Sequence, residues 1–367
     1  MLKQYRLKDY KFRLVFMVIA LSVIGILVVG SADASYQSRQ AMGFAGGMVV
    51  MIIASLVDYN WLLNFYWLEY ILGIVLLLAV RFFGSEAGGA TRWIDIGFLR
   101  FQPSDVEKII LILFYAKIFT KYEEKLNSFP RILFFLATVL VPWYLIFDQP
   151  NLSTSIVVLL LFCAMIFIGG LSYKIIGGII AVGVPLVIIF FSIILQPDQT
   201  LLHGYQVDRI LGWLYPEEYP DISNQQTNSI IAIGSGQLYG KGLNNNEVAS
   251  VNNGNFIPEP QTDFIFAVLG EELGFLGCCI VVILELLIAL ECIQIGRRAR
   301  DMTGTLIGCG MGALIFFQCF VNIGVATGLL PNTGLPLPFV SYGLTSLVSF
   351  CMGIGIVLNV GLQVRKY

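Results

Sequence analysis

Long apolar blocks constrain this chain more than any other feature of its sequence. Of its 367 residues, 57% are hydrophobic and only 13% are charged. The apolar residues form long runs and do not alternate at the period of a strand or an amphipathic helix. A helix of about 20 residues crosses the hydrocarbon core and satisfies its own backbone polar groups. A soluble chain of this length would need more charge to cover its surface. The sequence therefore predicts an all-α membrane protein.

The blocks predict about ten transmembrane helices in one polytopic domain, residues 1–367. We expect them near 12–30, 42–57, 64–83, 104–120, 131–147, 153–170, 175–196, 264–294, 304–329 and 340–363. The first block lacks a small-residue cleavage site and further spans follow directly, so it does not resemble a cleaved signal peptide. The polar residues 197–263 are expected to form one large extracytoplasmic loop.

The positive charges predict the orientation. One side of the predicted topology carries 15 of the 22 Lys and Arg residues, namely Lys3, Arg6, Lys8, Lys11, Arg13, Lys117, Lys121, Lys125, Arg131, Lys174, Arg297, Arg298, Arg300, Arg365 and Lys366. Lys and Arg concentrate in cytoplasmic loops. Both termini are therefore expected in the cytoplasm, which requires an even number of spans.

Several classes of site are excluded. No basic patch suggests nucleic acid, and there is no CxxC pair, Cys/His cluster or Walker loop. The seven cysteines, such as Cys163, Cys278 and Cys351, lie in apolar spans and are interpreted as small hydrophobic residues. The single histidine, His203, is interpreted as a solvated residue of the large loop.

The large loop is expected to be ordered. Residues 204–218 have the pattern of a helix on the membrane surface, and residues 225–236 predict a half-buried helix ending at a Gly turn. Asp263 stands where this loop enters the eighth span. It either caps the helix N-terminus or has a chemical role. Glu271 and Glu272 lie two turns deeper, where carboxylates face the protein interior or a wet cavity.

Polar residues also mark two other outer segments. Asp105 and Lys108 lie one turn apart at the outer end of the fourth span, either as an ion pair or with Lys108 binding an anionic ligand. Arg92 and Arg100 add positive charge at that surface. Residues 328–343 contain three prolines and three glycines, which predicts irregular backbone buried in protein or lining a cavity.

An acid beside cations at the outer leaflet suits a lipid-linked anionic substrate. Lys and Arg bind phosphate or pyrophosphate, and a carboxylate can act as general base on a sugar hydroxyl. These residues support glycosyl transfer from a polyprenyl donor, and equally a lipid transporter.

The motifs resemble the SEDS family of cell-wall proteins, which includes RodA, FtsW and SpoVE, along essentially the whole chain. They are Arg92-Trp93, Gln102-Pro103-Ser104 with Lys108, Gln149-Pro150, residues 232–236 with 240–242, Pro258-Glu259, Thr262-Asp263-Phe264, and Asn322 with Ser341-Tyr342-Gly343. The amino-acid sequence of residues 92–104 most resembles that of the RodA subgroup.

The resemblance implies a peptidoglycan glycosyltransferase of the bacterial cytoplasmic membrane. It would polymerise lipid II at the outer face for cell elongation and rod shape, releasing undecaprenyl pyrophosphate. Its partners would be a class B penicillin-binding protein and other elongasome components. A lipid II flippase and a non-catalytic scaffold are the alternatives.

The resemblance places the family's essential acidic residue on Asp263, and its conserved Glu and Lys of the fourth span on Asp105 and Lys108. The roles that follow are hypotheses. Asp263 would be the general base, or would bind a divalent cation, Mg or Mn, which could also neutralise the pyrophosphate. Substrate or pyrophosphate binding is expected of Lys108, Arg92, Lys241, Asp105, Gln102 and Ser104. Supporting roles are expected of Glu259, Thr262, Glu271, Glu272, Ser341 and Tyr342. The chain departs from the family pattern at Asp105 (usually Glu), Asn151 (Asp), Ser153 (Gly), Gln237 (Gly) and Leu344 (Gly).

Overall fold

The protein is a bundle of long helices. The computed structural model describes residues 9–87, 90–97, 99–194, 204–243 and 256–363. Ten helices of 17 to 33 residues in this described part each overlap one expected block: α1 (Phe12–Ala32), α2 (Ala34–Leu56), α4 (Tyr66–Phe83), α5 (Pro103–Lys121), α6 (Phe129–Asp148), α7 (Leu152–Ile168), α8 (Tyr173–Ile194), α12 (Ile265–Arg297), α13 (Met302–Ala326) and α14 (Leu344–Leu362).

Seven helical segments of the described residues are long and apolar enough to cross a membrane. One of them joins α4 to the short α3 (Tyr59–Leu62) and η2 (Leu63–Phe65) that precede it. Helix α7 is a shorter apolar helix, and α5 carries five charged residues. The class of a multi-pass helical membrane protein is therefore confirmed.

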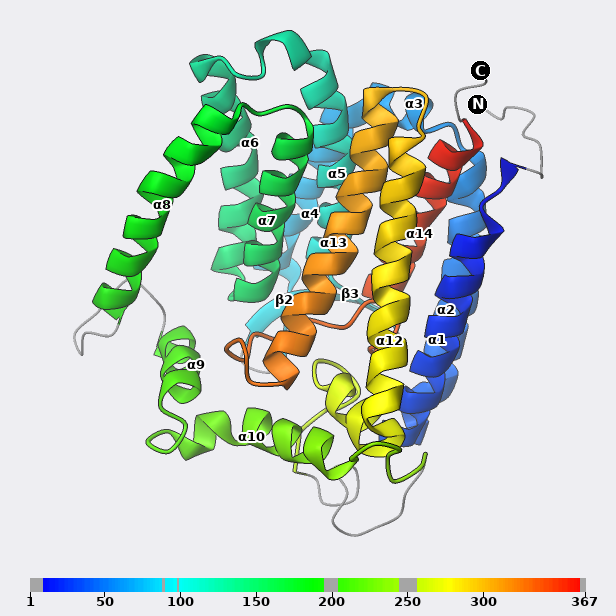
Figure 1. Ribbon diagram of the computed structural model, residues 1–367, viewed down its shortest axis with the longest axis vertical. Helices are drawn as coiled ribbons and strands as arrows, with labels where there is room; N and C mark the ends of the chain where they lie inside the picture. The colour runs from blue at the N-terminus through cyan, green and yellow to red at the C-terminus, as the bar shows by residue number, and fades with distance from the viewer. Residues whose placement is uncertain (1–8, 88–89, 98, 195–203, 244–255, 364–367) are drawn as a thin grey trace.

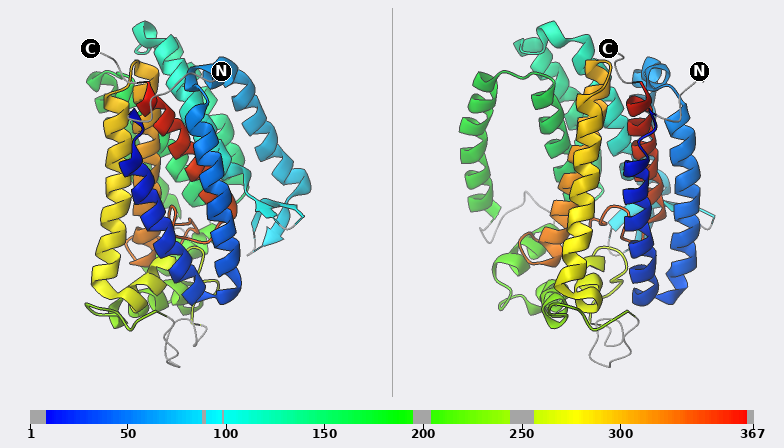
Figure 2. Two further views of the ribbon diagram at one scale, coloured as in Figure 1. Left: turned by 90° about the vertical axis from the view of Figure 1, so that its right-hand side faces the viewer. Right: turned by 45° about the vertical axis from the view of Figure 1, so that its right-hand side comes forward.

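The helices run along the long axis of the molecule. Helix α1 begins and α14 ends at the same end of the bundle, the upper end in Figure 1 and in both views of Figure 2. Helices α9 (Gly204–Leu214) and α10 (Pro220–Ser235) lie at the opposite end. Both segments of the large loop that were expected to be helical are therefore helices. His203 lies outside the described residues.

A small antiparallel sheet was not predicted. It consists of β1 (Ser85–Ala87), β2 (Ala90–Ile96) and β3 (Leu99–Phe101), in that order. Residues 90–101 then lead directly into α5, so the sheet holds β2 at the same end of the bundle as the site described below.

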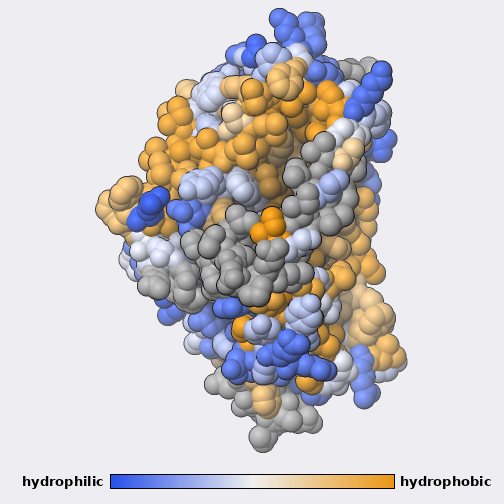
Figure 3. Space-filling view, turned by 90° about the vertical axis from the view of Figure 1, so that its left-hand side faces the viewer, coloured by the Kyte–Doolittle hydropathy of each residue, from blue (hydrophilic) through white to orange (hydrophobic). Residues whose placement is uncertain are grey.

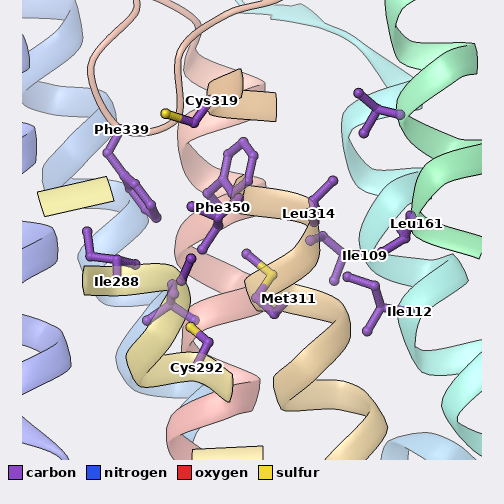
Figure 4. Packing of buried hydrophobic residues seen from close by; sticks show 14 of the residues in the cluster. Ile109, Ile112, Leu161, Ile288, Cys292, Met311, Leu314, Cys319, Phe339 and Phe350 are labelled. Atoms are coloured by element: carbon purple, nitrogen blue, oxygen red, sulfur yellow. The ribbon is translucent and has the colours of Figure 1, made fainter. Parts of the chain in front are cut away.

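Helices α13 and α14 supply much of the core. Phe350, Met311 and Leu314 are buried between them and their neighbours (Figure 4). Close packing depends on small residues: a Cβ atom on Gly308 of α13 would lie 2.6 Å from the Gly296 Cα atom of α12. Small residues allow such backbone approach between membrane helices. The cysteines are free thiols, and five of the seven are buried, whereas Cys163 is exposed on α7.

Helix α12 breaks near its N-terminal end, at Gly274, and a loop binds the backbone at the break. Gly274 takes φ +64°, outside the helical region. The backbone N–H groups of Lys241 and Gly242 donate to the carbonyl oxygens of Glu271 and Glu272, at 2.9 Å each. The carbonyl oxygen of Gln237 in turn accepts from the N–H of Phe275, at 2.8 Å. The loop after α10 thus replaces helical hydrogen bonds that the kink removes, and it joins α10 to the first turns of α12.

Candidate active site

The segment 333–337 is the irregular backbone at the centre of the site. Its residues Thr333, Leu335 and Leu337 are buried, as expected for non-helical backbone at membrane depth. Side chains from α7 and α13 hold its carbonyl groups. The Ser153 hydroxyl donates to Thr333, the Asn322 amide to Leu335, and the Gln318 amide to Pro336, at 2.8, 2.6 and 3.0 Å.

Asp263 lies against this segment at the entrance to α12. A Cβ atom built on Gly334 would lie 2.9 Å from the Asp263 Oδ2 atom. The Asn322 side-chain amide also donates to the backbone oxygen of Asp263 at 2.8 Å. The same amide therefore binds both the backbone of Asp263 and the carbonyl oxygen of Leu335 in segment 333–337. The Asp263 side chain is only partly buried. Asp263 does not cap α12, because the N-cap residue is Phe264 and no side chain makes a capping hydrogen bond there.

Two arginines face Asp263. The position that a Cβ atom on Gly334 would occupy also lies 3.7 Å from the Arg92 Nη1 atom. Arg92 of β2 and the Asp263 carboxylate are therefore both close to this position. Arg92 is 8% exposed, and it donates to the carbonyl oxygens of Gln149 and Pro150. Arg209 of α9 is the second cation that acts electrostatically on Asp263, and it donates to the Asn332 oxygen at 3.2 Å.

Burial raises the pKa of Asp263 above its ordinary value. The charges of Arg92 and Arg209 oppose that shift, and the nearby carboxylate of Glu259 adds to it. A carboxylate with a raised pKa is a stronger base, which suits proton removal near neutral pH.

Lys108 forms a second, enclosed cluster. Its ammonium group lies 2.8 Å from both Asp105 Oδ1 and Gln318 Oε1, and it faces the Phe350 ring at 5.7 Å. Lys108 is 1% exposed. Of the two alternatives for Lys108, an ion pair or an anionic ligand, the structure shows the ion pair with Asp105. Because protein groups surround Lys108 here, the structure does not offer it as an open pyrophosphate ligand.

Gln102 and Ser104 lie at the start of α5, beside this cluster. The Gln102 side-chain amide donates to the Ser104 hydroxyl at 3.2 Å, and the Gln102 backbone N–H donates to the hydroxyl of Thr345, in the first turn of α14, at 3.3 Å. Ser104 is buried, whereas Gln102 is partly exposed. These contacts connect α5 to the start of α14.

Lys241 lies in the loop after α10 and binds a part of α12 that is further along the chain than Asp263. Its ammonium group pairs with Glu271 at 2.8 Å, and Glu272 accepts a hydrogen bond from Ser31 of α1. Both glutamates are buried, as their depth in the apolar segment predicted. The pairing supports the sealed kink at Gly274.

The remaining expected residues shape the turn before Asp263. Glu259 has φ +47°, and Thr262 donates to its carbonyl oxygen through both its N–H and its hydroxyl. The Tyr342 N–H donates to Gln261 O at 2.8 Å. The Ser341 hydroxyl accepts from the N–H of Leu337 at 2.7 Å. This turn is therefore tied to the 333–341 loop.

Sequence reasoning missed Arg209, Gly334 and Gln318. Arg209 and Gln318 come from segments far from Asp263 in the chain, and a lone Gln inside an apolar span gives only a weak signal. The four-residue spacing of Gln318 and Asn322 was the available clue, because residues at i and i+4 share a helix face.

Two departures from the family pattern have direct structural consequences. The Asn151 side chain caps α7 by accepting from Thr154 N at 3.4 Å, which Asp would also do. Ser153, in place of Gly, supplies the hydroxyl that holds Thr333.

The described residues do not by themselves provide a full set of ligands for a divalent cation. They contain no group of three or more His, Cys, Asp or Glu side chains with a metal-binding arrangement. Arg92 and Arg209 already provide positive charge at Asp263. The expected Mg or Mn ion stays a prediction, and no step below depends on it.

Fold and site together define a multi-pass membrane protein with a carboxylate–arginine site at one end of its helix bundle. The family profile of the FtsW, RodA and SpoVE cell cycle proteins matches residues 10–366. The peptidoglycan glycosyltransferase MrdB of Escherichia coli strain K12 is 36% identical over 351 residues, covering 95% of this chain and 92% of that protein. The probable peptidoglycan glycosyltransferase FtsW of Haemophilus influenzae is 33% identical, covering 98% and 92%.

Two solved structures share the fold. A chain of a peptidoglycan synthase complex, described as coordinating polymerization and crosslinking, superposes with a TM-score of 0.80 and 27% identity, covering 96% of this chain and 97% of that one. The rod shape determining protein RodA of Thermus thermophilus gives a TM-score of 0.69 at 25% identity, covering 98% of each chain. The chain belongs to the FtsW/RodA/SpoVE family of cell cycle proteins.

Proposed function

We propose that this chain is a peptidoglycan glycosyltransferase that polymerises lipid II at the outer face of the bacterial cytoplasmic membrane. The observation that carries the proposal is the half-buried Asp263 carboxylate, which lies against Gly334 at one end of the bundle and feels the charges of Arg92 and Arg209. The curated relatives named as peptidoglycan glycosyltransferases support this reaction class. The likeness to RodA supports a role in cell elongation and rod shape.

We propose that ten helices cross the membrane with the Asp263 end outside. Lys117 and Arg297 lie in or at the ends of helices at the opposite end of the bundle, as the positive-inside rule requires of a cytoplasmic face. Figure 3 supports a membrane position, since a broad hydrophobic surface lies between hydrophilic residues at the upper tip and in the lower part.

In the proposed step, the Asp263 carboxylate removes the proton from the 4-hydroxyl group of the acceptor GlcNAc. The hydroxyl oxygen forms a bond to C1 of the donor MurNAc while the bond from C1 to the pyrophosphate oxygen breaks. The anomeric configuration inverts. Undecaprenyl pyrophosphate leaves with the bonding electron pair, and the proton remains on Asp263.

Arg92 is the proposed cation for the substrate's pyrophosphate, because it flanks the position beside Asp263. Lys108 acts on the site indirectly: through Gln318 it supports Pro336, two residues beyond Gly334. In this proposal Lys108, Asp105, Gln102 and Ser104 are positioning residues. Lys241 keeps its predicted substrate role only if a ligand replaces Glu271.

The proposed partner is a class B penicillin-binding protein that crosslinks the glycan. The neighbouring structure from a complex that couples polymerization to crosslinking supports such a partner. Helices α9 and α10 form an outer surface that a partner could contact, since both lie outside the main bundle (Figure 1).

The test uses the purified chain with its transpeptidase partner and lipid II, with glycan strands resolved on a gel. Asp263→Asn is expected to lower the polymerisation rate ~10²–10⁴-fold, the typical contribution of a general base. Asp95→Asn is the control, because Asp95 is a half-exposed acid of β2 paired with Arg100. Polymerisation by Asp263→Asn at the parental rate would overturn the proposal, as would lipid II translocation without polymer by the parent.

Asp263→Asn is not expected to unfold the chain. A carboxyl group whose pKa is raised on folding destabilises the folded state once the pH exceeds its unfolded pKa. Removing that charge should leave thermal stability at neutral pH unchanged or higher, which separates lost chemistry from lost structure.

A further inference from the structure

A basic cavity lies at the end of the bundle opposite Asp263. It has a volume of about 360 Å³ and is lined by Tyr66 of α4 and by Lys117, Thr120 and Lys121 of α5. A second hollow of about 520 Å³ shares Thr120 and Lys121, and continues to Lys125 and Arg131. Small-molecule sites commonly fall in this range of volume.

The cations of this cavity carry no carboxylate partner. Among the described residues, Lys117, Lys121, Lys125 and Arg131 form no ion pair, although Glu123 and Glu124 line the outer hollow. These four cations outnumber the two acids, so the lining of the two hollows carries a net positive charge. Lys117 is half-buried within α5, about one turn before the helix ends.

Aromatic rings hold two of the cations in place. The Lys121 ammonium group donates to the Tyr66 hydroxyl at 3.1 Å and faces the Tyr66 and Tyr122 rings at 5.7 Å each. The Arg131 guanidinium lies 4.0 Å from the Tyr122 ring centroid. Such cation–π contacts attract the ammonium and guanidinium groups to the ring faces. Positive-inside topology explains the sign of these charges, but it does not require them to surround one cavity.

An exposed apolar surface begins at the same place. Phe65, Trp67 and Leu68, which flank Tyr66 in the chain, are 44%, 40% and 63% exposed. Tyrosine and tryptophan concentrate at the headgroup level of a membrane. A ligand with its anionic group in the cavity could therefore lay its apolar chains along α4, which a soluble anion cannot do.

We infer that this cavity binds the headgroup of an anionic glycerophospholipid, its phosphate beside Lys117 and Lys121 and its acyl chains against α4. The assignment to the cytoplasmic leaflet rests on the orientation given under Proposed function, whereas the binding itself does not. Basic pockets between membrane helices on that side are a recurring form of lipid headgroup site.

The experiment titrates the detergent-purified full chain with phosphatidylglycerol and counts bound lipid by native mass spectrometry. Each basic residue near a membrane surface contributes about fivefold in affinity, so Lys117→Gln with Lys121→Gln should bind about 25-fold more weakly. The matched control is Lys174→Gln with Arg298→Gln, which removes two exposed charges that do not line the cavity, and it should bind like the parent.

Two further probes test the lipid assignment. Phosphatidylcholine with the same acyl chains should bind more weakly than phosphatidylglycerol, and inorganic phosphate at the same concentration should not displace it. Equal binding of both lipids, displacement by phosphate, or parental affinity in the double variant would each overturn the inference. The single variant Lys117→Gln, expected to lose about fivefold, decides the matter if the double variant unfolds. The Asp263 polymerisation assay does not depend on these outcomes.

Discussion

The backbone of Gly334 lies so close to the Asp263 carboxylate that the two residues define one another's position. Gly334 has φ +66°, and a methyl group on it would come within 2.9 Å of Asp263 Oδ2. Glycine reaches this backbone conformation without a steric penalty. The absence of a side chain at position 334 is therefore what lets the carboxylate approach the loop.

Gly334→Ala should strongly reduce polymerisation. The new methyl group must displace the carboxylate, and an error of about 1 Å in the position of a catalytic group can lower a rate about 10²-fold. The left-handed φ adds about 1–2 kcal/mol of strain. The measurement is the rate of glycan synthesis from lipid II.

Gly97→Ala is the matched control for that variant. Gly97 has φ +65°, but among the described residues no atom lies within 4 Å of the position its Cβ would take. It should show the same backbone strain in thermal unfolding and retain nearly parental activity. Equal loss of activity in both variants would assign the effect to strain and not to the Asp263 contact.

The rate of polymerisation should fall on acidification at a pH above the ordinary aspartate pKa of about 3.9. Asp263 must be ionised to accept a proton, and burial raises its pKa. The check is the initial rate measured from acidic to neutral pH, with stability followed in parallel to exclude acid unfolding.

The fall in rate on acidification forms the acidic limb of the pH–rate profile. Two variants should move this limb in opposite directions. Arg209→Gln removes a cation that lowers the pKa of Asp263, so the limb should move to higher pH. Glu259→Gln removes an acid that raises the pKa of Asp263, so the limb should move to lower pH. Movement in the same direction, or none, would show that Asp263 does not set the profile.

Lys108→Met should destabilise the fold. The substitution leaves Asp105, 4% exposed, without its partner at 2.8 Å, and breaking a buried pair from one side destabilises by about 3–5 kcal/mol. Adding Asp105→Asn should restore much of the thermal stability, because the uncompensated charge is gone. Thermal unfolding in detergent measures both.

The exposed pair Arg81–Asp148 is the comparison for that prediction. Its side chains are 65% and 39% exposed at 3.4 Å, so Arg81→Met should change stability by at most about 1 kcal/mol. If Lys108→Met were equally mild, the enclosed cluster could not be what supports segment 333–337.

The long helices were predictable because hydrophobic length and charge are local properties of the chain. The same is true of the Asp105–Lys108 pair, whose members lie one turn apart. Depth in the apolar block also predicted that Glu271 and Glu272 are buried.

The arrangement around Asp263 was not predictable in the same way. Arg209 reaches it from a helix outside the bundle, and Gln318 acts through the carbonyl oxygen of Pro336. These relationships depend on how distant segments pack, and no local pattern records them. Lys108 also shows that a buried cation can be fully satisfied by protein groups, which charge alone does not reveal.

Gln237→Gly should stabilise the protein. Gln237 occupies a position where the family pattern has Gly, and it has φ +50° in the left-handed region. That conformation destabilises a residue with a side chain by about 1–2 kcal/mol, whereas Gly loses more chain entropy on folding, about 0.5–1 kcal/mol. The difference predicts a net gain of up to about 1.5 kcal/mol, seen as a higher melting temperature.

Asn224→Gly provides the control, because Asn224 is exposed within α10 and Gly lowers the stability of a helix interior. Its melting temperature should fall while that of Gln237→Gly rises. Since the Gln237 carbonyl oxygen accepts from Phe275 at the α12 kink, relief of strain there should also leave polymerisation intact. A lower melting temperature for Gln237→Gly would mean that the glutamine side chain stabilises the loop by more than its backbone strain costs.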